Sequence, residues 1–379
     1  MQSSDEPVFQ KADGYACTEN VIPEEYLVRM KDDSLKIVHA KDDEAFLENY
    51  FEPNKENLKS AEPHYRVSVS TQFFGGAQNT TKDNWGVQAI HADRYWAQNI
   101  YGSSVIVAVV DTGVDISHTQ LQSQIAYNQG EIPGNGIDDD NNGYVDDWAG
   151  YDFYNDRGLT GDNAEHGTHV SGIIAAAHNA RAAGPSTAVE GVAPQAKILP
   201  AAFMGPDGSG AIESAVKAIR YAVSRGAKII NASWGGSACS VTLRDEIRGL
   251  QEKNVLFVAA AGNNGVLLDT WPEYPAAFES LSQLTVGSID ANFMRSSFSN
   301  YSSRFVQIFA PGGGITSTVP GGYATFSGTS MATPFVSGAA ALLWSQDPTL
   351  SAIDVRQRIL QSIEIESSYQ NQTRGRLAL

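Results

Sequence analysis

Three short motifs in this chain each carry a residue type that takes part in nucleophilic catalysis. They read DTGVD at 111–115, HGTHVSG at 166–172 and FSGTSMATP at 326–334. A serine hydroxyl becomes a nucleophile when a histidine removes its proton and an aspartate orients that histidine. Taken singly, an aspartate or a serine is more often a helix cap, and a lone histidine is more often structural. The three motifs therefore have to be weighed together.

Zinc binding is the other chemistry that the histidine motif allows. His166 and His169 are three positions apart and would share one face of a helix. No third ligand follows at a spacing typical of zinc sites, so zinc is not expected. The two cysteines, Cys17 and Cys239, form no CxxC pair, which also argues against zinc–thiolate and dithiol redox sites.

Ser330 precedes a long apolar stretch that has the pattern of a buried helix. Its small neighbours allow that helix to begin close beneath a crevice, with Pro334 expected in the first helical turn. A serine at this helix start would hold a developing oxyanion near the positive end of the helix dipole. The segment is not the α/β-hydrolase elbow, because Ala332 stands where that motif has glycine.

The elements that must position these motifs alternate between apolar strands and helical patterns. Strands are predicted at 105–111, 197–203, 228–233, 255–261 and 284–289, and helices at 213–226 and 243–254. Continuously apolar strands alternating with helices are typical of a parallel sheet covered on both faces. Ligands bind such sheets at the carboxyl ends of the strands, which is where DTGVD is expected.

The first part of the chain differs in composition from the rest. Residues 1–79 carry 23 charged side chains, whereas the remaining 300 carry 46. Segments 25–30 and 65–70 alternate like strands, and 42–51 has the pattern of an amphipathic helix. We therefore expect a small separate α+β domain, followed by a linker at 71–84 that is rich in Gly, Asn and Thr.

Overall composition excludes some classes of function. The net charge of −17 argues against nucleic-acid binding, because a phosphate backbone would be repelled. No run of about 18 apolar residues occurs, so no membrane span is expected. The excess of acidic side chains is compatible with a soluble protein that holds divalent cations.

Together, the three motifs resemble the signature motifs of the subtilisin-like serine proteases, the subtilases. The resemblance runs from about residue 83 to 379. It implies a three-layer α/β domain with a mainly parallel central sheet, and a serine endopeptidase that works through an acyl-enzyme. It also implies a triad of Asp111, His166 and Ser330, with Asn263 of AAAGNNG as the oxyanion-hole donor.

Two further segments resemble the subtilase segments that pair with an extended peptide substrate. They are ASWGG at 232–236 and DGSGA at 207–211, where glycine would let the substrate backbone approach closely. The implied substrate-binding residues are Ser233, Trp234, Gly235, Gly208, Ser209 and Gly210. Small residues at 259–262 imply a roomy P1 pocket, for which we expect an apolar or large P1 side chain.

The N-terminal domain resembles a subtilase propeptide, which assists folding and inhibits the enzyme. We therefore divide the chain into a propeptide at 1–77 and a peptidase domain at 78–379, with autocleavage between Ala77 and Gln78. Cys17 and Cys239 either form a disulfide that tethers the propeptide beside the cleft or remain two separate thiols.

An acidic loop at 134–153 resembles the opening of a calcium-binding EF-hand loop. Its core reads D-x-D-x-N-G-Y from Asp138 to Tyr144, although Ala149 stands where an EF-hand has its bidentate Glu. A solvated acidic surface is the alternative, but clustered carboxylates without a cation repel one another. We predict a structural calcium ion, which would be held by Asp138, Asp140, Asn142, Asp147 and the Tyr144 carbonyl. A second subtilase calcium site is not expected, because its usual aspartate is Gln120 here.

The family and the propeptide imply a secreted enzyme. The first residues, MQSSDEPVFQ, lack the apolar stretch of a signal peptide, so we expect a leader to have been removed. A monomer that acts on proteins and peptides is expected, without nucleic-acid or membrane partners. The alternatives are a catalytically silent protein that keeps the fold and only binds, and a calcium-dependent interaction module. An esterase or peptide-ligase activity of the same triad also stays open.

Overall fold

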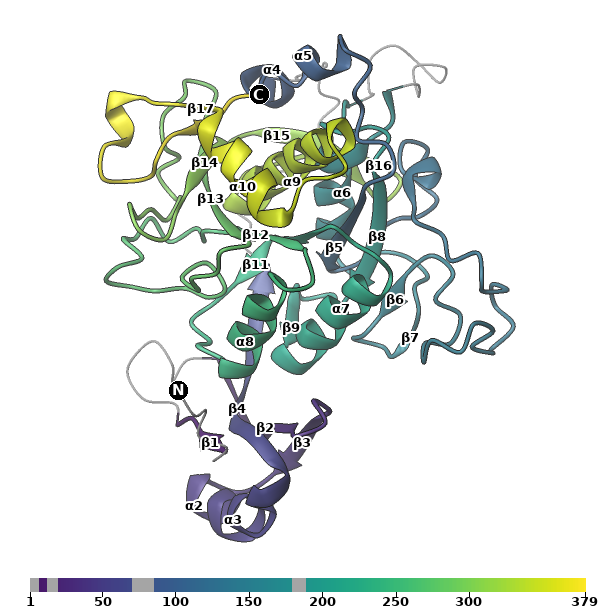
Figure 1. Ribbon diagram of the computed structural model, residues 1–379, viewed down its shortest axis with the longest axis vertical. Helices are drawn as coiled ribbons and strands as arrows, with labels where there is room; N and C mark the ends of the chain where they lie inside the picture. The colour runs from purple at the N-terminus through teal and green to yellow at the C-terminus, as the bar shows by residue number, and fades with distance from the viewer. Residues whose placement is uncertain (1–6, 12–19, 70–84, 179–188) are drawn as a thin grey trace.

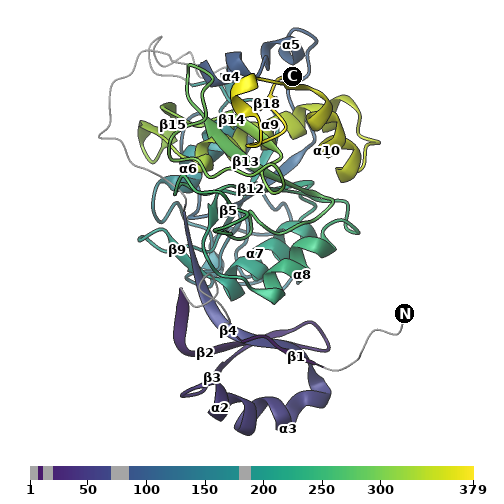
Figure 2. The ribbon, with the colours of Figure 1, turned by 90° about the vertical axis from the view of Figure 1, so that its left-hand side faces the viewer.

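The computed structural model describes residues 7–11, 20–69, 85–178 and 189–379. A large α/β domain makes up most of the molecule, and a small N-terminal domain projects from one end of it (Figures 1 and 2). Strand β4, Leu58–Val69, begins in the small domain and ends against the large one.

The core of the large domain is a ten-stranded sheet with the order β17-β18-β14-β13-β12-β10-β5-β8-β6-β7. The pairings from β14 through β8 are all parallel. This confirms the predicted mainly parallel sheet, in which all five predicted strands form. Their bounds are β5 Ile106–Asp111, β8 Lys197–Ala202, β10 Ile229–Ala232, β12 Leu256–Ala260 and β13 Gln283–Ile289. The remaining strands are β14 Ile308–Pro311, β17 Ile363–Glu364, β18 Arg376–Leu377, β6 Tyr151–Asp152 and β7 Arg157–Gly158.

Helices cover both faces of this sheet. Successive side chains of each strand point to opposite faces, and the side chains on both faces are apolar. Val107 and Val109 of β5 belong to the core shared with α6 and α9, whereas Ala108 and Val110 belong to the core shared with α7 and α8. The covering helices are α6 His166–Ala175, α9 Thr329–Gln346 and α10 Ala352–Gln361 on one face, and α7 Ile212–Ser224 and α8 Val241–Gly249 on the other. None of the described helices is long and apolar enough to cross a membrane.

Short elements complete the large domain. The hairpin of β15 and β16 leads directly into α9, and two short helices precede β5. Their bounds are β15 Ile315–Val319, β16 Gly322–Phe326, α4 Trp85–Ala89, α5 Asp93–Trp96, η3 Gln122–Gln124 and η5 Ser367–Tyr369.

The N-terminal domain is a small sheet of order β1-β4-β2-β3 that packs on a short helical segment. Tyr26 and Val28 of β2 meet Phe46 and Phe51 of the helical segment in its core. The predicted strands and helix are present, while the strand β3 had not been predicted. The bounds are β1 Val8–Phe9, β2 Val21–Met30, β3 Leu35–His39, α2 Asp43–Phe46, η1 Leu47–Phe51, α3 Glu52–Asn54 and η2 Lys55–Asn57.

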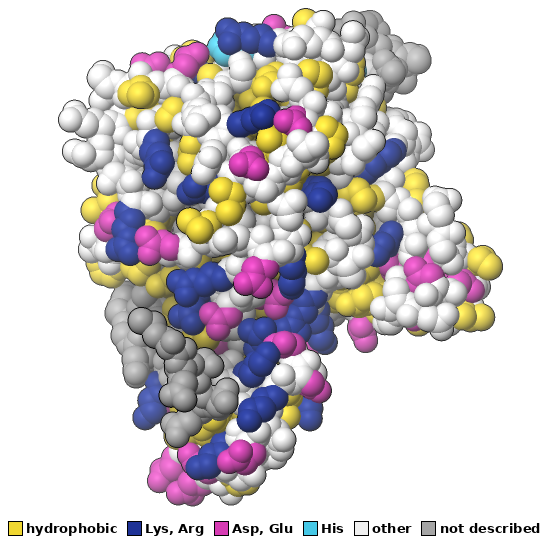
Figure 3. Space-filling model, viewed as in Figure 1, with side chains coloured by type: hydrophobic (Ala, Val, Ile, Leu, Met, Phe, Trp, Pro, Cys, Tyr) yellow, Lys and Arg dark blue, Asp and Glu magenta, His cyan; other side chains and the backbone are white. Residues whose placement is uncertain are grey.

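Two short strands of the large domain, β9 Ser209–Ala211 and β11 Trp234–Gly235, pair with β4 rather than with the main sheet. Both pairings are antiparallel, so the end of β4 lies between them. Lys and Arg side chains gather where the small domain meets the large one (Figure 3), among them Arg29, Arg220 and Lys253, with acidic partners such as Glu246.

Candidate active site

The carboxyl end of β5 and the start of helix α6 bring Asp111 and His166 into direct contact. Asp111 is the last residue of β5, and His166 is the first residue of α6. Nδ1 of His166 lies 2.7 Å from Oδ1 of Asp111, and both side chains are buried. Among the described residues, Nε2 of His166 has no hydrogen-bond partner. The carboxylate therefore fixes the ring through one nitrogen, and the other nitrogen can exchange a proton.

A second carboxylate, Asp162, holds the two segments that carry this pair. It accepts hydrogen bonds from the Thr112 hydroxyl at 2.6 Å and from the Thr168 amide at 2.8 Å. Thr112 follows Asp111, and Thr168 lies two residues after His166. Burial raises the pKa of Asp162, although its hydrogen-bond donors favour the charged form. The sequence motifs do not include Asp162, and the one signal for it is a carboxylate four positions before His166.

The other histidine of the motif, His169, has a structural role. Its Nε2 lies 3.1 Å from the carbonyl oxygens of Ile315 and Ala324, so it ties α6 to the β15–β16 hairpin. The ring is buried and stacks on Phe326. Burial lowers its pKa to about 3, which keeps the ring neutral.

Ser330 lies in the first turn of α9, which packs against α6. Its hydroxyl donates to the Ser233 carbonyl at 2.8 Å, and the Ser233 hydroxyl donates to the Ser330 carbonyl at 2.9 Å. Pro334, predicted in the first turn, is six residues into α9 and thus in its second turn. Because proline has no N–H for the carbonyl four residues earlier, Ser330 would lose its helical donor. The Ser233 hydroxyl supplies the missing hydrogen bond.

Asn263 follows β12 and turns its amide toward the start of α9. Its Oδ1 accepts hydrogen bonds from the Thr329 amide at 2.9 Å and from the Thr329 hydroxyl at 3.0 Å. This fixes the orientation of the side chain beside Ser330. Because the oxygen accepts from Thr329, the amide nitrogen points the other way.

The predicted substrate segments lie on both sides of β4. Val67 pairs with Gly210 and Ser68 with Ser209 on one side, and the Val69 amide donates to the Gly208 carbonyl at 3.0 Å. On the other side the pairs are Ser68 with Gly235 and Val69 with Trp234. The chain's own N-terminal domain thus occupies the position predicted for a bound peptide (Figure 1).

Two helices of the large domain receive caps from the N-terminal domain. The buried carboxylate of Glu62 accepts from the Ser240 hydroxyl at 2.6 Å and from the Val241 amide at 2.7 Å, at the start of α8. At the start of α7, the Glu213 amide donates to Nε2 of His64 at 3.3 Å. Anionic and acceptor groups are favourable at these helix ends. Burial raises the pKa of Glu62 and lowers that of His64.

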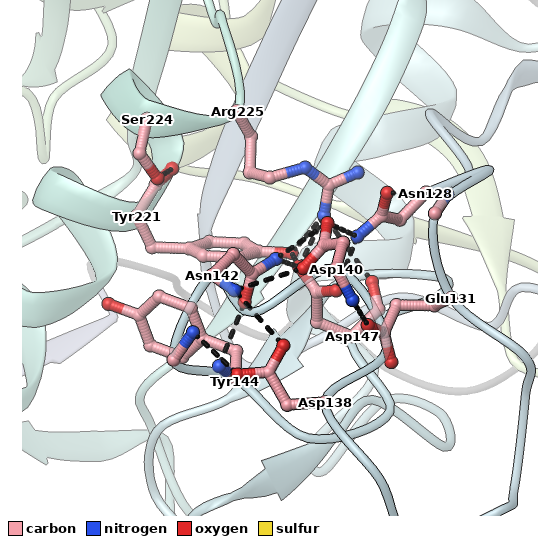
Figure 4. Close-up of polar contacts among 12 residues, drawn as sticks. Asn128, Glu131, Asp138, Asp140, Asn142, Tyr144, Asp147, Tyr221, Ser224 and Arg225 are labelled. Carbon is pink, nitrogen blue, oxygen red and sulfur yellow. Dashed lines mark hydrogen bonds and ion pairs between the residues drawn. The ribbon is translucent and has the colours of Figure 1, made fainter.

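The acidic loop brings together three carboxylates, from Glu131, Asp140 and Asp147 (Figure 4). One oxygen of each lies within 4.8 Å of the others. Glu131 is buried, and its Oε2 has no hydrogen-bond partner among the described residues. Its Oε1 accepts from the amides of Asp139 and Asp140. Glu131 was not predicted as a ligand, because an isolated glutamate seven residues before Asp138 belongs to no motif.

The other predicted calcium ligands have partners inside the loop. Asp138 accepts hydrogen bonds from the Asn142 and Gly143 amides, and the Asn142 Oδ1 accepts from the Tyr144 amide. Asp147 is buried and pairs with Arg225 at 2.5 Å, as Figure 4 shows. Carboxylate oxygens and an unpaired buried oxygen fit a hard cation such as calcium, and Arg225 already offsets one of the three charges.

The predicted processing site and half of the predicted disulfide lie outside the described residues. These are Ala77, Gln78 and Cys17. Within the described part, Gln10 donates a hydrogen bond to the Cys239 carbonyl at 3.2 Å. Gln10, which is seven residues before Cys17, therefore lies beside Cys239.

The chain is similar to known proteins in sequence and in structure. Residues 102–377 match the Peptidase_S8 family, which is described as the subtilase family. The chain is 35% identical over 277 residues to subtilisin DY of Bacillus licheniformis, which covers 73% of this chain and 89% of that protein. It is 34% identical over 316 residues to a thermophilic serine proteinase of Bacillus sp. strain AK1, which covers 82% of this chain and 69% of that protein. The crystal structure of a cold adapted subtilisin-like serine proteinase matches with a TM-score of 0.64 and 28% identity, over 79% of this chain and 98% of that one.

Proposed function

Because this chain belongs to the subtilase family and is a serine-type endopeptidase, we propose that it cleaves proteins through Asp111, His166 and Ser330. The observation that carries the proposal is the buried Asp111–His166 pair. Nε2 of His166 has no hydrogen-bond partner among the described residues, and the helix α6 that carries it packs against α9, whose first turn contains Ser330. This arrangement supports a base and a nucleophile at neighbouring helix ends.

The proposed reaction begins with rotation of the Ser330 hydroxyl away from the Ser233 carbonyl. His166 accepts the hydroxyl proton at Nε2 while Oγ attacks the peptide carbonyl, and it later returns the proton to the leaving amine. Asp111 holds the ring tautomer and stabilises the imidazolium. The Asn263 amide and the Ser330 main-chain N–H stabilise the oxyanion, and water then hydrolyses the acyl-enzyme.

Substitution of the nucleophile tests this function. We expect Ser330→Ala to abolish casein hydrolysis, because no other group can form the acyl-enzyme. Ser345→Ala, in the last turn of the same helix, is the matched control and should retain activity. Equal hydrolysis by wild type and Ser330→Ala would end the assignment of Ser330. No hydrolysis by the wild-type chain would favour the catalytically silent alternative.

We propose that residues 1–77 are an inhibitory propeptide that the enzyme removes itself. The position of β4 between β9 and β11 supports this, because a strand in the substrate groove excludes other peptides. The sequence predicts cleavage between Ala77 and Gln78. The pairing of Val69 with Trp234 favours a bond nearer the N-terminus. A peptide paired in this way would place the residue that follows the Val69 position opposite Ser233. N-terminal sequencing of the active form distinguishes these bonds, and a start beyond Trp85 would contradict both.

We also propose a disulfide between Cys17 and Cys239, which would keep the cleaved propeptide attached. The contact of Gln10 with Cys239 supports it. Mass spectrometry of the cleaved, unreduced protein should find both fragments in one species, whereas two separable fragments would contradict the tether.

We propose that the acidic loop binds one structural calcium ion. Glu131, Asp140 and Asp147 would hold it, joined by the predicted ligands Asp138, Asn142 and the Tyr144 carbonyl. The bound ion would neutralise the clustered carboxylates and fix the loop. The family favours a secreted monomer that acts on proteins and peptides, and the net charge of −17 favours no nucleic-acid partner.

A further inference from the structure

The register of β4 shows where the cleaved residue of a substrate would lie. Val69 is opposite Trp234, so the next residue of a peptide bound in the same way would face Ser233. The Ser233 carbonyl is the group that accepts the Ser330 hydroxyl at 2.8 Å. The substrate residue at this position is therefore the P1 residue, provided that Ser330 is the nucleophile of the proposed function.

Two glycines belong to the segments beside this position. Gly235 belongs to β11, and Gly262 lies between β12 and Asn263. A Cβ on Gly262 would collide with the carboxylate of Glu273, and a Cβ on Gly235 would come within 3.0 Å of the Tyr274 carbonyl oxygen. The consecutive residues Glu273 and Tyr274 therefore lie against Gly262 and Gly235, respectively.

The loop that carries Glu273 is fixed against β11 by main-chain hydrogen bonds. The Gly236 amide donates to the Tyr274 carbonyl at 2.9 Å, and the Tyr274 amide donates to the Gly236 carbonyl at 2.7 Å. A Cβ on Gly262 would also collide with Asn300, whose amide donates to the Ala261 carbonyl at 3.0 Å. These contacts hold the Glu273 carboxylate behind Gly262.

The charge of Glu273 is not compensated by another residue of the described chain. Its Oε1 accepts from the Asn264 amide at 2.5 Å, and Asn300 is its other hydrogen-bonding partner. Both partners are neutral, and no described Lys or Arg forms an ion pair with this carboxylate. Burial raises the pKa of Glu273. A carboxylate that is largely removed from water is stabilised when a cation enters beside it.

We propose that Glu273 selects substrates with Lys or Arg at P1. The glycine segments would accommodate the long aliphatic part of such a side chain, and its cationic end would reach the carboxylate. This inference rests on the proposed function and changes one of its expectations. The proposal keeps the large P1 side chain that is expected from the sequence, but the Glu273 carboxylate beside Gly262 replaces the apolar preference with a cationic one.

Peptide substrates that differ only at P1 test the inference. We expect the processed wild-type enzyme to cleave a lysine substrate with a kcat/KM at least about 10-fold above that of its norleucine analogue, which has nearly the same shape and no charge. Glu273→Gln should lower that ratio about 10-fold or more and leave cleavage of the norleucine substrate within about 3-fold. Glu279→Gln is the matched control, because Glu279 is exposed on the same loop and pairs with Arg304.

An unchanged lysine-to-norleucine ratio in Glu273→Gln would overturn the inference. Should that variant fail to fold, inhibition of the wild-type enzyme by peptide aldehydes ending in lysine or norleucine decides the matter. Tighter binding of the lysine aldehyde supports the inference, and equal binding overturns it. Absence of cleavage of every substrate would instead count against the proposed function.

Discussion

Asn263 illustrates how one side chain can be prepared for catalysis by its neighbours. Two donors of Thr329 hold its oxygen and thereby fix the orientation of the side-chain amide. The side chain therefore does not lose conformational entropy during the reaction. The same two contacts couple β12 to the start of α9. The position of the proposed oxyanion donor is therefore set by the helix that carries the proposed nucleophile.

Removing this donor should slow the chemical step and leave substrate binding nearly unchanged. We expect Asn263→Ala to lower kcat by about 10²- to 10³-fold, the range known for the oxyanion donor of subtilisin itself, with little change in KM. Steady-state kinetics on one peptide substrate measure both constants. Asn292→Ala, on an exposed loop, is the control. A loss confined to KM would show that Asn263 only binds substrate.

His169 makes a prediction about acid stability. Its pKa is near 3 in the folded chain because the ring is buried, whereas an unfolded histidine has a pKa of about 6.5. The stabilisation from the neutral ring is complete above pH 6.5 and is lost as the pH falls toward 3. At pH 4 this loss is on the order of 3 kcal/mol.

Glutamine at position 169 should remove this acid-induced loss of stability, because its side chain does not take up a proton. In inactive Ser330→Ala protein, we expect His169→Gln to lower the thermal unfolding midpoint at pH 7, because the fit to Phe326 is lost. The additional fall of the unfolding midpoint between pH 7 and pH 4 should be smaller in His169→Gln than in the Ser330→Ala parent. His39→Gln, at an exposed site, should behave as the parent does. An equally large acid-induced drop in His169→Gln would show that this ring does not govern acid stability.

Helices and strands whose apolar residues follow a local pattern could be predicted from the sequence. The apolar segments ending at Asp111 and Ala260 formed parallel strands, and the small-residue stretch after Ser330 formed a helix. The contacts that join distant segments could not be predicted. The β4 register depends on pairing across more than 140 residues, and Asp162 and Glu131 gain their roles only through tertiary contacts. Pro334 was misplaced by one turn because Ser233, far away in sequence, compensates for its missing N–H.

The acidic loop gives a prediction for calcium removal. In Ser330→Ala protein, excess calcium should raise the thermal unfolding midpoint by about 5 °C over protein in chelator, because a cation that binds only the folded chain stabilises it. Asp140→Asn and Glu131→Gln should each reduce that difference. Asp245→Asn, on α8, is the control outside the loop. A midpoint that does not respond to calcium in the parent would contradict the site.

For the molecule as a whole, the proposed inhibition by the N-terminal domain rests on the contacts between the two domains. Strand β4 fills the groove, and Glu62 adds a charged cap to α8. Hydrogen bonds to a charged group at a helix end contribute about 1.5–3 kcal/mol. The N-terminal domain is thus held both by strand pairing and by helix capping, at separate positions.

Weakening the cap should release the N-terminal domain sooner. We expect Glu62→Ala to shorten the lag before freshly folded protein cleaves a peptide substrate, by about 10-fold if release limits activation. The measurement is the progress curve of the full chain. Glu56→Ala, at an exposed position of the same domain, should keep the wild-type lag. A wild-type lag in Glu62→Ala would mean that the cap does not contribute to retention.

Covalent labelling of the processed enzyme tests the central assignment most directly. A fluorophosphonate reacts with a serine whose hydroxyl proton is removed by a neighbouring base, so its position identifies the nucleophile. The account predicts one label per chain, found by peptide mass spectrometry on Ser330, and no label in His166→Ala protein that wild-type enzyme has processed. A label on a different serine, or undiminished labelling of Ser330 without His166, would contradict it.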